Sequence, residues 1–182
     1  MDATTLTAED RVQIVQIFGE LRENLSSYMS DREFKMSNAQ LFTFLTYAPV
    51  CLAIASDRDV DESEIRLLDK ITKDIDVNTM VSLDLMEVIA IATEPGEIML
   101  NEEFNMRVDS ELLYLSRNID KYEENILAAV KALLKIDKDP SAETSLTQTF
   151  SKWFEFVVKK NANRNDKLEL EKVAKYKEKI GL

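Results

Sequence analysis

The sequence contains no histidine, and this absence excludes several classes of enzyme. Without histidine the chain cannot form a Ser-His or Cys-His nucleophile pair, and it lacks the usual zinc and non-heme iron ligands and the commonest general base. The single cysteine, Cys51, lies in an apolar run without a basic neighbour, so we expect a core residue rather than a reactive thiol. The sequence therefore predicts no enzyme, and a carboxylate-only, metal-dependent phosphohydrolase is the least favoured alternative.

Glycine and proline are also scarce, with three of each in 182 residues, whereas hydrophobic residues make up 45%. Few helix-breaking residues and no strand-like alternation favour helices throughout. We expect an all-α protein, a compact single-domain bundle of about seven to nine helices over residues 1–182. Within it, an N-terminal helix at 8–29 and a basic C-terminal helix at 166–180 should pack on the remainder of the chain.

Positive charge is scarce in the first part of the chain, where 19 acidic residues outnumber eight basic ones. The net charge of −11 belongs to residues 1–100, because residues 101–182 carry equal numbers of acids and bases. The last segment, Lys159–Leu182, has eight bases and four acids, so it should fold back on the acidic half, dock on an acidic partner or lie in solvent. No nucleic-acid binding is expected, since neutralising phosphates needs a large positive surface.

No targeting segment is evident, because Met1–Arg11 lacks the basic and apolar regions of a signal peptide. Residues Ser37–Ser56 are uncharged and long enough to cross a bilayer. Polar residues interrupt this run and acidic clusters flank it, so we predict a buried core helix, kinked or split by Pro49 near Ala48, with no stable membrane insertion. The expected location is cytoplasmic.

Apolar residues at intervals of three and four predict the remaining helices. Thr7 should cap the first one, and Asp139 should cap another from about Ser141 to Lys160 whose surface is apolar on most sides. The most regular pattern is a seam from Val108 to Ile136, which predicts one long helix or two collinear helices with a break near Asn118. Packing within the chain is the favoured use of this seam, and homodimerisation is the alternative. Further helices are expected at 38–55, 61–74 and 79–92.

The densest cluster of one chemistry is acidic, with five carboxylates in the eight residues 57–64. Asp57 and Asp59 alternate as in calcium loops, and Glu64 should lean back over them from the first turn of a helix. These three side chains are candidate ligands for Ca²⁺ or Mg²⁺. This stretch does not fit the EF-hand pattern, because it lacks the glycine and the final acidic residue that an EF-hand loop requires. The alternative is helix capping by Asp61, with neighbouring acids favoured by the helix dipole.

A weaker copy of this pattern follows at Ile136–Glu143, again an apolar helix, Asp-x-Asp, a short gap and Glu. Asp137 and Glu143 are its candidate metal ligands. Two such units about 80 residues apart suggest an internal duplication and a fold of two related helix-loop-helix halves.

The stretch from Pro49 to about Ile75 resembles the TerB-like tellurite-resistance domain. That family typically shows an apolar helix, Ala-Asp-Gly, a few polar residues and Glu, often twice, and the corresponding residues here are Ala-Ser-Asp-Arg-Asp-Val-Asp-Glu-Ser-Glu. The resemblance implies a compact all-helical domain over about residues 38–160 with divalent-metal binding, in a family with members attached to co-chaperone or stress-response modules.

Carried over by residue, Asp57 and Glu64 match the first motif of the family, and Asp137 and Glu143 match the second. Arg58 and Lys138 depart from it, because they stand where the family has glycine. The sequence thus predicts a non-enzymatic stress-response or regulatory domain with an acidic Ca²⁺ or Mg²⁺ site. The alternative is a metal-free scaffold that binds a protein partner or a second copy through the seam or the basic terminal helix.

Overall fold

The computed structural model describes residues 7–33, 36, 38–57, 61–66, 70, 102–143, 145–162 and 167–182. Most of these residues are helical and none of them lies in a β-strand, which confirms the all-α class. The α-helices are α1 (Ala8–Asp31), α2 (Asn38–Ile54), α5 (Glu102–Leu133), α6 (Leu146–Ala162) and α7 (Lys167–Ile180), and the short 3₁₀ helices are η1 (Ala55–Asp57) and η3 (Leu134–Ile136).

The count of seven to nine helices is not reached within these residues. They contain the five α-helices and a short helical segment at 62–66. The helix expected at 79–92 and half of the one expected at 61–74 lie outside the described residues. Two related halves are not shown either.

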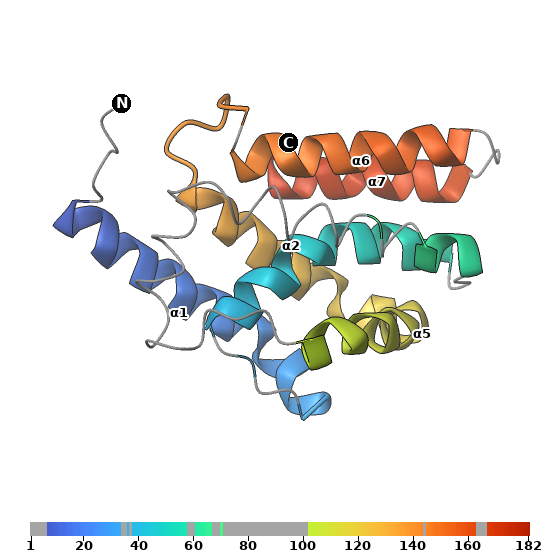
Figure 1. Cartoon of the computed structure of the whole chain (residues 1–182), viewed down its shortest axis with the longest axis horizontal. Helices are drawn as coiled ribbons and strands as arrows, with labels where there is room; N and C mark the ends of the chain where they lie inside the picture. Colours follow the sequence, from blue (N-terminus) through green and yellow to red (C-terminus); the bar gives the residue numbers. More distant parts are fainter. Residues whose placement is uncertain are drawn as a thin grey trace.

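Helix α2 forms the centre of the molecule. Figure 1 shows α6 and α7 side by side along one side and α1 along the opposite side, with α2 crossing between them. Every described side chain from Leu41 to Ser56 is buried, as expected of a helix that is apolar on all sides. Pro49 lies inside α2 without splitting it. Within the described part of the chain, no helix is both long and apolar enough to cross a membrane.

Helix α1 follows its sequence pattern closely. Its N-cap is Thr7, as predicted, in a capping box where Asp10 N donates to Thr7 Oγ1 at 3.1 Å and Thr7 N donates to Asp10 Oδ2 at 2.7 Å. The helix ends at Asp31, two residues beyond the predicted end. Its buried stripe is the apolar set that the spacing selects: Ile14, Ile17, Phe18, Leu21, Leu25 and Tyr28.

Helix α5 confirms the predicted break. Asn118 has a non-helical backbone (φ −127°, ψ 21°), and its side-chain amide donates to the Tyr114 carbonyl oxygen at 3.0 Å. Most of the seam is buried inside the chain, where α5 contacts α1 and α2. The buried seam residues are Leu115, Ile119, Tyr122, Ile126, Ala129 and Leu133. This stretch is therefore used for intramolecular packing.

The start of α6 corrects the sequence prediction. The helix begins at Leu146 rather than near Ser141, and Asp139 does not cap it. Asp139 Oδ1 accepts hydrogen bonds from the Ser141 amide at 3.0 Å and the Ser141 hydroxyl at 2.5 Å, which holds these residues in a turn. Leu146, Phe150, Phe154 and Val157 are buried along one side of α6, whereas Phe156 is 39% exposed.

Candidate functional site

The first acidic motif forms a capping box at the start of the 62–66 segment. Asp61 N donates to Glu64 Oε2 at 2.8 Å, while Glu64 N donates to Asp61 Oδ1 at 2.9 Å. Glu64 is only 5% exposed, so its carboxylate is fixed at the helix start. Asp57 ends η1, but its side chain lies outside the described residues, as does all of Asp59. The capping alternative thus accounts for the described half of this motif.

The second acidic motif caps α6. Asp137 Oδ1 accepts from Leu146 N at 3.0 Å, and Oδ2 accepts from Thr147 N at 2.8 Å and from the Thr147 hydroxyl at 2.6 Å. Both carboxylate oxygens therefore bind the otherwise unpaired donors of the first turn. Glu143 has a different environment, because its side chain is 90% exposed and lies 3.7 Å from the Lys152 ammonium.

The described residues contain no group of three or more His, Cys, Asp or Glu side chains placed to hold a metal ion. This statement does not extend to the Asp57 side chain or to Asp59. Of the five predicted ligands, the structure thus places Glu64 and Asp137 as caps of different helices, and Glu143 in solvent.

The capping role of Asp137 gives a direct prediction. We expect Asp137→Ala to lower the free energy of unfolding by about 1–2 kcal/mol, because three donors at the start of α6 lose their acceptor. Chemical denaturation followed by circular dichroism would measure this change. The matched control is Glu143→Ala, which removes an exposed pair and should change stability by less than about 0.5 kcal/mol. Equal effects of the two substitutions would contradict the assignment.

Sequence reasoning missed a buried polar cluster between α1 and α5. Its centre is Glu111, whose side chain is 8% exposed. The Arg32 guanidinium donates to both carboxylate oxygens, from Nη2 at 2.7 Å and from Nε at 2.9 Å. The Tyr28 hydroxyl donates to Glu111 Oε2 at 2.5 Å. One carboxylate of α5 thereby holds the last turn of α1.

Two further tyrosines extend this cluster. The Tyr122 hydroxyl donates to Asp31 Oδ2 at 2.6 Å and lies 2.8 Å from the Tyr114 hydroxyl. Burial, followed by the hydrogen bond to Glu111, raises the pKa of Tyr28, and burial followed by the hydrogen bond to Asp31 raises the pKa of Tyr122. Both phenols are therefore neutral donors at physiological pH and not activated nucleophiles. The cluster joins α1 to α5.

A second buried carboxylate, Glu123, anchors the basic C-terminal helix. It accepts from Lys175 Nζ at 2.9 Å, Lys172 Nζ at 3.0 Å and the Tyr176 hydroxyl at 3.1 Å. Burial favours the neutral acid, but the hydrogen bonds from Lys175 and Lys172 prevail and lower the pKa of Glu123. The basic helix does fold back, as one alternative held, and three of its lysines, Lys172, Lys175 and Lys179, pair with Glu123 and Glu124 of α5.

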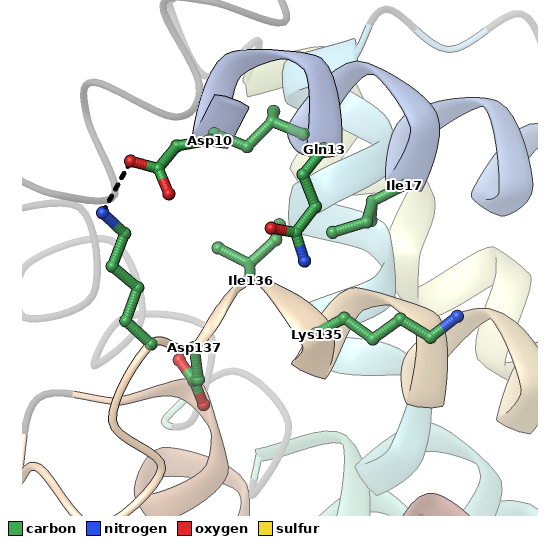
Figure 2. Close-up of a pocket in the computed structure, with 8 residues that line it drawn as sticks. Asp10, Gln13, Ile17, Lys135, Ile136 and Asp137 are labelled. Carbon is green, nitrogen blue, oxygen red and sulfur yellow. Dashed lines mark hydrogen bonds and ion pairs between the residues drawn. The ribbon is translucent and has the colours of Figure 1, made fainter. Parts of the chain in front are cut away.

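A small cavity lies between the start of α1 and the loop that follows η3 (Figure 2). Its volume is about 130 Å³, and it is lined by Asp10, Gln13, Ile14, Ile17, Lys135, Ile136, Asp137 and Lys138. The Lys138 ammonium lies 2.9 Å from Asp10 Oδ2, an ion pair visible in Figure 2. Its hydrogen bond, together with those from Thr7, lowers the pKa of Asp10 to about 2. Lys138 thus ties this loop to α1.

Comparisons with protein-family models, curated proteins and solved structures gave no match in any of the three cases.

Proposed function

We propose that this chain is a non-enzymatic, metal-free helical module that acts by binding another protein. The observation that carries the proposal is that two of the described acidic-motif carboxylates are used to cap helices. Asp137 uses both oxygens to cap α6, and Glu64 completes a capping box with Asp61. Acids placed in this way have a structural reason to be concentrated at helix starts. In this proposal, the surfaces of the helices form the contact with a partner protein.

Titration with Ca²⁺ and Mg²⁺ tests the metal-free part of this proposal. We expect no binding heat at millimolar concentration and an unfolding temperature that is the same with either ion and with a chelator. An ion that binds, present at a free concentration of about a hundred times its dissociation constant, would raise the free energy of unfolding by about 2.7 kcal/mol, so thermal unfolding can detect it. The control is Asp57→Asn combined with Glu64→Gln, which keeps hydrogen-bonding groups at both positions. A metal-dependent rise that this variant abolishes would overturn the proposal.

The second candidate is a cytoplasmic TerB-like stress-response domain with a Ca²⁺ or Mg²⁺ site at Asp57, Asp59 and Glu64. One observation favours it. The Ser56 hydroxyl in η1 is buried, with the residue 7% exposed, and it has no hydrogen-bond partner among the described residues. A buried oxygen of this kind beside Asp57 could be satisfied by a cation or its bound water. The titration above distinguishes the two candidates.

A further inference from the structure

The cavity of about 130 Å³ between α1 and the segment after η3 has an apolar floor and a polar rim (Figure 2). Ile14 and Ile17 of α1 form the floor and are 4% and 3% exposed, and Ile136 adds a third, partly buried isoleucine. Gln13 and Lys138 stand at the rim and are exposed. An apolar surface bordered by a few polar groups is the usual composition of a site for a small molecule.

Gln13 supplies this cavity with an uncommitted amide. Figure 2 shows its side chain extending from α1 into the space beside Ile136. Within the described part of the chain, neither the carbonyl oxygen nor the amide nitrogen of this side chain forms a hydrogen bond. An amide is both an acceptor and a donor, so it can bind a donor and an acceptor of the same ligand.

Asp10 and Lys138 also keep hydrogen-bonding capacity at one end of the cavity. The Thr7 amide and hydroxyl, each at 2.7 Å, and the Lys138 ammonium at 2.9 Å all donate to Asp10 Oδ2. No described residue donates to the other oxygen, Oδ1. The Lys138 ammonium has three N–H groups, and among the described residues only Asp10 accepts from it. A negative acceptor and a positive donor therefore lie side by side, each with a free position.

The other charged residues of the lining are already used. Lys135 Nζ donates to both carboxylate oxygens of Glu20, at 3.0 and 2.9 Å, and Asp137 caps α6 with both of its oxygens. The lining thus holds two acids and two lysines, which balance. Glu9 and Arg11, further charged residues at the start of α1, have opposite signs and neither lines the cavity. The charges here favour neither an anion nor a cation.

A ligand with a single charge meets repulsion in this cavity. A carboxylate bound to Lys138 would lie beside Asp10, and an ammonium bound to Asp10 would lie beside Lys138. A ligand that carries both groups on one carbon atom finds a partner for each. Size sets the remaining limit, because a dry cavity of about 150 Å³ holds benzene, so this one admits roughly six to eight non-hydrogen atoms. Alanine and valine fall in this range.

We propose that this cavity binds a free α-amino acid with a small apolar side chain, such as valine. Asp10 Oδ1 and the Gln13 carbonyl oxygen accept from its ammonium group. Lys138 Nζ and the Gln13 amide nitrogen donate to its carboxylate. Its side chain packs on Ile14 and Ile17. This site goes beyond the proposed protein-binding function and does not depend on it.

Titration of the full chain with valine, followed by two-dimensional NMR, tests the site. We expect a dissociation constant on the order of 1 mM, the modest affinity of so small a ligand. The largest shift changes should fall on the amides of residues 10–17 and 135–138. The matched ligands are 3-methylbutanoate, which lacks the ammonium group, and 2-methylpropylamine, which lacks the carboxylate. Each should bind at least about tenfold more weakly than valine, because one charge of the cavity then repels it.

Gln13→Leu should weaken valine binding about tenfold, because the ligand loses a donor and an acceptor. The matched control is Gln16→Leu, the same change at an exposed position of the same helix outside the lining, and it should leave the dissociation constant unchanged. Lys138→Met gives a sharper result, because it leaves the Asp10 carboxylate without its ion pair. This variant should bind 2-methylpropylamine more tightly than valine, a reversal that a purely structural role of Lys138 would not produce.

Three outcomes would overturn the inference. These are a valine titration without shift changes, equal affinities for valine and its two single-charge relatives, and equal losses of affinity in Gln13→Leu and Gln16→Leu. Each of them concerns this cavity alone. The Ca²⁺ and Mg²⁺ titration tests the metal-free proposal separately, so either one can fail while the other stands.

Discussion

Replacing Glu111 by leucine should lower the free energy of unfolding by about 3 kcal/mol or more, because it leaves a charged partner without its counter-ion. Arg32 would lose two hydrogen bonds at a position where its side chain is only 26% exposed, and the Tyr28 hydroxyl would lose its acceptor. Tyr28 itself is 1% exposed, so water cannot readily replace that acceptor. Urea denaturation followed by circular dichroism measures the loss.

The double variant Glu111→Leu with Arg32→Leu provides the control. Removing both charges leaves no unpaired ion, so its stability should be higher than the sum of the two single effects predicts. Additive losses would show that the two side chains act independently and would contradict the contacts at 2.7 and 2.9 Å. A loss of stability below about 1 kcal/mol for Glu111→Leu alone would also contradict these contacts.

Replacing Glu123 by alanine should loosen the C-terminal helix. The carboxylate is 6% exposed and accepts from two lysines and a tyrosine of α7, so its removal leaves three donors without their acceptor. We expect a loss of about 2–3 kcal/mol, with faster hydrogen exchange in α7 than in α1. Glu124→Ala is the matched control, because Glu124 also pairs with a lysine of α7 but is 69% exposed. Its effect should stay below about 1 kcal/mol.

The contacts of Glu123 should make the free energy of unfolding depend on pH in the acidic range. Because the pKa of Glu123 is lower in the folded protein than its ordinary value of 4.5, the folded chain releases this proton more readily than the unfolded chain. The contribution of Glu123 to stability is therefore fully present above its ordinary pKa of 4.5, and it is lost as the pH falls through the folded-state pKa. In the Glu123→Ala variant, the loss of stability that protonation of Glu123 causes at low pH should be absent. An identical pH profile in the variant and the parent chain would contradict this account.

Local patterns were readable from the sequence, and distant pairings were not. The start of α1 at Thr7, the break at Asn118 and the box of Asp61 with Glu64 depend on residues within one or two turns of each other. Each of these features was predicted, although Asp61–Glu64 was one of two alternatives. The apolar run that became α2 was also assigned to the core, because only a fully buried helix tolerates so little charge.

The two buried carboxylates could not be found in this way. Glu111 bonds to residues 79 and 83 positions earlier, and Glu123 to residues about 50 positions later. Along the sequence both look like ordinary acids of a solvated helix face, and only the packing of α5 against α1 and α7 shows otherwise. The late start of α6 was missed for a related reason, because its cap, Asp137, lies nine residues before the first helical residue. Proline after Asp139 suggested a nearer cap.

The central position of α2 has a consequence for synthesis of the chain. Its described side chains between Leu41 and Ser56 are all buried, and three of the helices that contact it, α5, α6 and α7, begin at residues 102, 146 and 167. A ribosome therefore completes α2 well before it makes these three helices. Until these helices emerge, the apolar side chains that they cover on α2 stay exposed, which makes the nascent chain prone to aggregation and dependent on a chaperone.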